Sequence, residues 1–261
     1  EHKAPITRIR DEIKSALREI RRCVTKGSAT DRLASHGRLI FDLLFPAEAK
    51  ALIRENEGTI TFHSRSLGAP WSLLHDGDDF LLARWSIGEI DGGSRIQNQG
   101  VDEPRQRRLF IIADPAEDLP AARHEGESVV RATSARSDSG GCDLRLGRHR
   151  RADLLRTFHR YGLVHFAGHV DSATAEQDGG WRLFDGHLTA SDIQSLSGRH
   201  FPSFVFVNAC QSATEELIAS LRGAGVRHII GTRVDLPDLA GADLATHFYA
   251  RLCGGDSVGE A

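Results

Sequence analysis

Two residues of the chain carry the side chains of a nucleophile and a base, and both follow apolar runs. His169 follows the run Leu163–Ala167 after one glycine, and Cys210 follows the run Phe204–Val207 after two residues. In an open parallel sheet, catalytic groups gather just beyond the carboxyl ends of the strands. Because neighbouring strands lie about 4.8 Å apart, residues at adjacent strand ends can meet. The sequence therefore predicts a thiol–imidazole pair, which is the chemistry of a thiolate nucleophile with its general base.

The residues after Cys210 also bear on its reactivity. Ser212 and Glu215 have the spacing of a capping box, which predicts a helix that begins two residues beyond the sulfur. A helix N-terminus carries partial positive charge and favours the thiolate form. The alternative is that Cys210 is a buried core cysteine and that His169 is an ordinary loop residue among 13 histidines. The spacing alone leaves both interpretations open.

The first part of the chain has the periodicity of helices. Apolar residues recur every three or four positions over residues 6–24, and a second such pattern runs over residues 30–46. Pro46 opens a third helical pattern that ends near Gly58. We expect an N-terminal helical region over residues 1–58 and a second domain over residues 59–261.

From Leu109 onward, short apolar runs alternate with helical patterns, after a polar loop predicted over about residues 91–107. Continuous apolar runs indicate strands that are buried on both faces, and the alternation predicts an α/β fold with a mostly parallel central sheet. The predicted strands are residues 109–112, 144–146, 163–167, 204–207 and 228–230, and the predicted helices are residues 120–132, 152–161, 213–223 and 239–252.

Composition excludes several classes of protein. The 261 residues are 40% hydrophobic with a net charge of −3, and no apolar run approaches the length of a membrane span. This balance predicts neither a membrane partner nor direct nucleic-acid binding. The four cysteines lack zinc-site spacing, which favours reduced thiols, a cytoplasmic location and no metal or other cofactor. Because the chain starts at Glu1 and stops at Ala261 without an obvious ending, we expect it to be a piece of a longer protein.

Three segments together resemble the CHAT domain, a caspase-like cysteine protease module that is often found beside tetratricopeptide repeats. They are His165-Phe-Ala-Gly-His169, the segment Leu183–Ile193 and the segment Val205–Ser212. Further matching pieces lie upstream and downstream, so the resemblance covers most of the chain from about Ile60. The combination is specific, although no single piece is.

The resemblance implies a caspase–separase type of three-layer α/β sandwich and a cysteine endopeptidase that works through an acyl-enzyme. In that family, the residue matching His169 is the general base and acid, and the residue matching Cys210 is the nucleophile. Backbone N–H groups at Gly168, Val170 and Cys210 are the candidates for stabilising the oxyanion. Val170 departs from the family pattern, which has glycine there, and a β-branched residue disfavours positive φ. The alternative function is therefore a catalytically silent protein-interaction module.

Other acidic residues are weaker candidates. Asp235 and Asp238 follow the strand that ends near Gly231, so we expect them to line a substrate pocket. Asp192 stands where it could orient His169, but an acid at a helix start is more often a cap. The expected partners are a protein substrate and a regulatory domain or activating partner.

One further motif has a structural interpretation. Residues 255–259 match the G-x-S-x-G pattern of serine hydrolases but follow a helical pattern rather than a strand. We interpret Gly255 as a helix cap.

Overall fold

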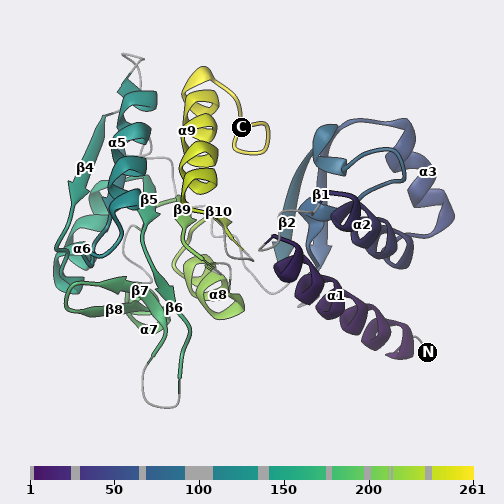
Figure 1. The fold of residues 1–261 in the computed structure, drawn as a ribbon, viewed down its shortest axis with the longest axis horizontal. Helices are drawn as coiled ribbons and strands as arrows, with labels where there is room; N and C mark the ends of the chain where they lie inside the picture. Colours follow the sequence, from purple (N-terminus) through teal and green to yellow (C-terminus); the bar gives the residue numbers. More distant parts are fainter. Residues whose placement is uncertain are drawn as a thin grey trace. The chain divides into compact units, whose positions relative to one another are not determined.

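The computed structural model describes two compact units, Glu1–Ser94 and Arg95–Ala261 (Figure 1). The structure describes the whole chain except residues 1–2, 25–29, 65–68, 92–107, 135–140, 175–177, 197–200, 211, 213 and 233–236. Except for its first residue, Asp91, the predicted polar loop lies outside the described residues.

The first unit begins with the predicted helices and ends in a small sheet. Its elements are α1 (Lys3–Val24), α2 (Thr30–Leu44), α3 (Ala47–Glu55), β1 (Gly58–Ser64), the 3-10 helices η1 (Trp71–Leu73) and η2 (Leu81–Ala83), and β2 (Trp85–Asp91). Strands β1 and β2 pair in parallel. Ile40, Phe41, Phe62 and Trp71 are buried in its core, and the Phe62 and Trp71 rings stack at 4.2 Å. The predicted N-terminal helical region is confirmed.

The second unit is built on a five-stranded sheet in which every pairing is parallel, with the strand order β10-β9-β5-β3-β4. These strands match the predicted apolar runs within a few residues. Their bounds are β3 (Leu109–Ala113), β4 (Cys142–Leu146), β5 (Leu163–Ala167), β9 (Phe204–Asn208) and β10 (His228–Gly231). The mostly parallel central sheet is therefore confirmed.

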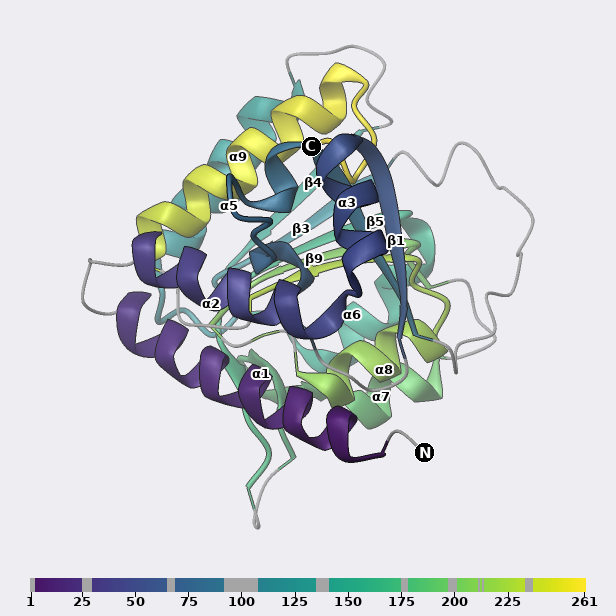
Figure 2. The same cartoon turned by 90° about the vertical axis from the view of Figure 1, so that its right-hand side faces the viewer.

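Helices cover both faces of this sheet. Alternate strand residues point to opposite faces, and because these residues are apolar, both faces must be covered. Leu109 and Ile111 pack with α5 and α9, whereas Phe110 and Ile112 pack with the helices of the other face. Figures 1 and 2 show α5 and α9 side by side on one face and α7 and α8 on the other. The helices are α5 (Pro120–Ser134), α6 (Arg151–Thr157), the 3-10 helix η3 (Phe158–Arg160), α7 (Ala190–Ser195), α8 (Glu215–Gly223) and α9 (Asp238–Gly254). This arrangement is the three-layer sandwich that the resemblance implied.

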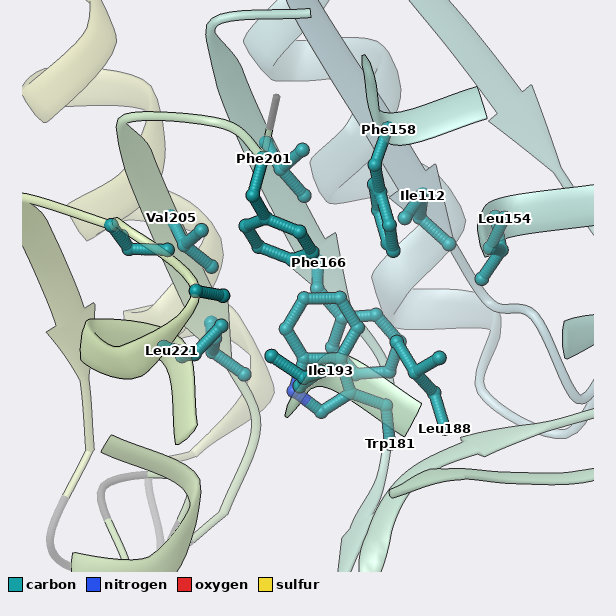
Figure 3. Packing of buried hydrophobic residues seen from close by; sticks show 14 of the residues in the cluster. Ile112, Leu154, Phe158, Phe166, Trp181, Leu188, Ile193, Phe201, Val205 and Leu221 are labelled. Atoms are coloured by element: carbon teal, nitrogen blue, oxygen red, sulfur yellow. The ribbon is translucent and has the colours of Figure 1, made fainter. Parts of the chain in front are cut away.

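A small antiparallel sheet follows β5 and was not predicted. It has the order β6-β7-β8, with β6 (Val170–Asp171), β7 (Gly180–Leu183) and β8 (Gly186–Thr189). Trp181 of β7 is fully buried and stacks on Phe166 of the central sheet at 4.5 Å. Figure 3 shows Trp181 packed among Phe166, Leu188 and Ile193. This packing fixes the segment that begins directly after His169.

Candidate active site

The topology places His169 and Cys210 at neighbouring strand ends. In the pairing of β5 with β9, Ala167 is opposite Asn208, so each candidate lies two residues beyond this pair. Both residues line one cavity of about 60 Å³. Cys210 is exposed, and the His169 side chain is 37% exposed. The other lining residues are Leu119, Ala121, Ala122, Glu125, Gly168, Asn208, Ala209, Pro237 and Gly241.

The segment after Cys210 differs from the prediction. Helix α8 begins at Glu215, and its N-cap is Thr214, whose side chain accepts a hydrogen bond from the Leu217 N–H at 3.3 Å. The predicted capping box at Ser212 is therefore wrong. The buried Ser212 hydroxyl instead donates to the Val207 carbonyl and accepts from the Thr232 N–H, both at 2.9 Å. Ser212 thus ties the cysteine loop to the sheet, and α8 begins later in the sequence than we expected.

The backbone around His169 is held by the antiparallel sheet. The Arg182 N–H donates to the His169 carbonyl oxygen at 2.9 Å, and Val170 pairs with Trp181 in extended conformation. The non-glycine residues with positive φ in the described part of the chain are Asp114 and Glu117, so the position of Val170 needs no glycine. Gly168 and Cys210 line the cavity with His169, whereas Val170 lines a different cavity of about 370 Å³.

The loop after β3 also contacts His169, because β3 pairs with β5 along the edge that does not pair with β9. The buried Asp114 carboxylate accepts hydrogen bonds from the Asp118 and Leu119 N–H groups, both at 2.9 Å. The loop conformation that these hydrogen bonds stabilise places Asp118 Oδ1 3.5 Å from His169 Nε2. Asp118 was missed by the sequence analysis, although an acid in the loop after the predicted strand 109–112 was a usable signal.

A buried hydrogen-bond network lies at the wall of the cavity. Oε1 of Glu125 lies 2.8 Å from His165 Nε2 and accepts a hydrogen bond from Asn208 Nδ2 at 2.8 Å. His165 is fully buried in β5. Gly241 lies against this network, since a Cβ atom there would be 2.7 Å from Asn208 Nδ2. The network joins α5 to the two strands that carry His169 and Cys210.

A second charged cluster supports the histidine segment. Arg182 donates two hydrogen bonds to the Asp171 carboxylate, at 2.6 and 2.7 Å, and His187 Nε2 lies 2.7 Å from Asp171 Oδ2. These hydrogen bonds, chiefly those from Arg182, lower the pKa of Asp171 to about 2. The same contact raises the pKa of Arg182. Asp171 is therefore ionised throughout the physiological range.

The remaining predicted residues have separate locations. Asp192 forms the capping box of α7 with Thr189 and lies 3.6 Å from Arg151, which confirms its interpretation as a cap. Asp235 and the side chain of Asp238 lie outside the description, although α9 begins at Asp238. Their role in a substrate pocket stays a prediction. Gly255 caps α9 with a φ of 106°, as expected.

Two further properties of the described residues bear on metal binding and on membrane insertion. No group of three or more histidine, cysteine, aspartate or glutamate side chains among them could hold a metal ion. None of the helices that the structure describes is long and apolar enough to cross a membrane.

The comparison with protein families agrees with this geometry. The family model of the CHAT domain matches residues 35–261. The chain belongs to the CHAT domain family. Its caspase-like, protease-related character follows from this membership. No curated protein matches the chain.

Proposed function

We propose that this CHAT domain is a cysteine endopeptidase in which Cys210 is the nucleophile and His169 is the general base and acid. The observation that carries the proposal is that the two residues follow neighbouring strands and line one cavity. Because Cys210 and His169 lie beyond the ends of their strands, both side chains are accessible to solvent. A reaction with a polypeptide substrate requires this accessibility. Family membership supports the same chemistry.

In the proposed mechanism, His169 takes the proton of the Cys210 thiol, and the thiolate attacks the carbonyl carbon of the scissile peptide bond. A carbon–sulfur bond forms, and the carbonyl oxygen becomes an oxyanion. The carbon–nitrogen bond then breaks while the imidazolium returns its proton to the leaving amine. Water then gives a proton to His169 while its oxygen attacks the thioester carbon. The carbon–sulfur bond breaks, the carboxyl product leaves, and the imidazolium returns the proton to the Cys210 sulfur, which restores the thiol and the neutral base.

The oxyanion needs hydrogen-bond donors that are already in place. Backbone N–H groups at Gly168 and Cys210 are our candidates, because both residues line the cavity. Val170, proposed with them on the family pattern, is the weaker candidate because it lines the other cavity. Asp235 and Asp238 stay candidates for the substrate pocket because they follow β10.

We also propose that the substrate is a cytoplasmic protein and that a regulatory domain or a partner activates the site. The cavity of about 60 Å³ is well below the 300–1,000 Å³ that is typical of ligand pockets. A peptide therefore needs more room than the cavity beside Cys210 provides. Binding of a partner that opens this cavity supplies a physical basis for activation.

The experiment compares Cys210→Ala and His169→Ala with the unchanged chain, using a thiol-directed activity probe and peptide cleavage. We expect either substitution to abolish cleavage while the thermal unfolding midpoint is kept. The double variant adds no further loss, because the two groups act as one unit. Near-normal turnover in either variant contradicts the dyad. Failure of the probe to label Cys210 under every activating condition favours a silent interaction module instead.

A further inference from the structure

His169 lies between two loops because β5 lies between β9 and β3 in the central sheet. The loop after β9 carries Cys210, and the loop after β3 carries Asp118. Ala113 of β3 and Asn208 of β9 both pair with Ala167 of β5. The three strand ends therefore present a thiol, an imidazole and a carboxylate in spatial order.

The contact between Asp118 and His169 identifies the ring nitrogen that faces the carboxylate. Asp118 Oδ1 lies 3.5 Å from Nε2 of His169. In a neutral imidazole, one nitrogen carries the proton and the other carries a lone pair. A carboxylate beside Nε2 favours the tautomer with the proton on Nε2, because only an N–H can donate to it. The lone pair then lies on Nδ1.

We propose that Asp118 is a positioning residue that fixes the orientation and tautomer of His169, so that Nδ1 is the atom that takes the proton of Cys210. The assignment of His169 as the base rests on the proposed function, whereas the tautomer of His169 that Asp118 favours does not depend on it. Asp118 acts through His169 and does not itself touch the substrate.

Asp118 is itself held in place from two directions. Its backbone N–H donates to Asp114 Oδ1 at 2.9 Å, and its Oδ2 lies 3.4 Å from Arg182 Nη1. Arg182 also binds the His169 carbonyl oxygen through its backbone N–H at 2.9 Å. One residue of β7 therefore fixes both the backbone of the base and the carboxylate that faces its ring.

Other nearby carboxylates are engaged elsewhere. Asp192 caps α7, and both oxygens of Asp171 are bonded to Arg182 or His187. Glu117 lies in the same loop as Asp118 but pairs with Arg148 at 2.7 Å and Arg123 at 3.6 Å. It provides a matched control, since Glu117→Gln removes a carboxylate from this loop without removing the one beside His169.

The test compares Asp118→Ala, Asp118→Glu and Glu117→Gln in the complete chain. Nitrogen-15 NMR reports the tautomer of His169, and the rate of Cys210 alkylation by iodoacetamide reports how well the base acts. We expect the unchanged chain and Glu117→Gln to show the Nε2-protonated form. Asp118→Ala mixes the tautomers and slows alkylation by about tenfold, because the charged contact that orients the imidazole ring is lost. Asp118→Glu restores part of the rate.

The unfolding midpoint should remain within a few degrees in all three variants, because Asp118 is 46% exposed. An unchanged tautomer in Asp118→Ala overturns the proposal. An equal slowing in Glu117→Gln also overturns it, since the loss would then come from the loop as a whole. If Cys210 is unreactive in the unchanged chain while the tautomer still depends on Asp118, the protease function fails and the positioning role stands.

Discussion

At the scale of single residues, the approach of Gly241 to Asn208 makes the position of Cys210 sensitive to one methyl group. Asn208 lies two residues before Cys210 and donates to Glu125. A Cβ atom at position 241 would be 2.7 Å from Asn208 Nδ2 and 3.0 Å from its Oδ1. We expect Gly241→Ala to displace this amide and to slow alkylation of Cys210 by about tenfold or more, since a shift of about 1 Å is costly at a reacting centre.

Gly223→Ala is the control for this substitution. Gly223 is also a helical glycine, but a Cβ atom there would have nothing within 4 Å. Alanine favours a helix by about 1 kcal/mol over glycine, so we expect unchanged reactivity and equal or greater stability. Equal alkylation rates in the two variants would mean that Asn208 does not position the cysteine.

The other cysteines provide a second prediction at this scale. Cys142 lies in β4, where burial raises the pKa of its thiol and disfavours the reactive thiolate. Cys253 lies near the end of α9, and Cys23 lies in α1. Substitution of these three by alanine should leave turnover unchanged, as measured by peptide cleavage at matched folded fractions. A large loss of turnover in a folded triple variant would implicate another thiol.

At the scale of elements, the β6-β7-β8 sheet depends on one aromatic side chain. Trp181 is fully buried and stacks on Phe166. We expect Trp181→Ala to lower the free energy of unfolding by about 3–5 kcal/mol, because it leaves a cavity in a packed core. Leu239→Ala in α9 is the control, since Leu239 is 75% exposed. A loss below about 1 kcal/mol in Trp181→Ala, measured by denaturant unfolding, would show that this sheet does not depend on the Trp181 packing.

The charged cluster of Asp171, Arg182 and His187 predicts that the free energy of unfolding depends on pH. The pKa of Asp171 is about 2 in the folded chain against an ordinary value of 3.8. Its contribution to stability is therefore complete above pH 3.8 and is lost as the pH falls towards 2. The carboxylate is 31% exposed, so solvent screening limits this contribution to about 1 kcal/mol.

Asp171→Asn tests this contribution by denaturant unfolding at several pH values. The variant should be less stable than the unchanged chain at pH 7, and the difference should shrink below pH 3.8. Asp42→Asn is the control, because Asp42 is 61% exposed in an ion pair with Lys50. A difference for Asp171→Asn that is constant across this range would contradict the assigned ionisation.

The central sheet was predictable from the sequence, whereas the small sheet was not. A strand such as Leu163–Ala167 is a continuous apolar run because helices cover both of its faces. The strands β6, β7 and β8 have only two to four residues each, too few to show a periodicity. Ser212 was misassigned for a different reason. Its spacing to Glu215 fits a capping box, but its hydroxyl is used in hydrogen bonds to Val207 and Thr232, which a local pattern cannot show. Asp118 follows a predicted strand and was a visible candidate, but pairing it with His169 required the strand order, which local patterns do not contain.

At the scale of the whole molecule, the family match extends over both compact units. It begins at residue 35, within α2, and continues through the central sheet to residue 261. The first unit has a core of its own that includes Phe41, Phe62 and Trp71. The second unit contains His169, Cys210 and the three strand ends that carry the candidate site. The proposed chemistry is therefore built entirely on the second unit.

The most direct test of the account is to map new protein N-termini after incubating the unchanged chain, with its activating partner or full-length context, in a cell extract. The matched control is Cys210→Ala under the same conditions. We predict a set of new termini that arises with the unchanged chain and is absent with Cys210→Ala and with His169→Ala. Cleavage that persists in the folded Cys210→Ala variant would contradict the assignment of the nucleophile. The absence of new termini with the fully activated, folded chain would contradict the protease function itself.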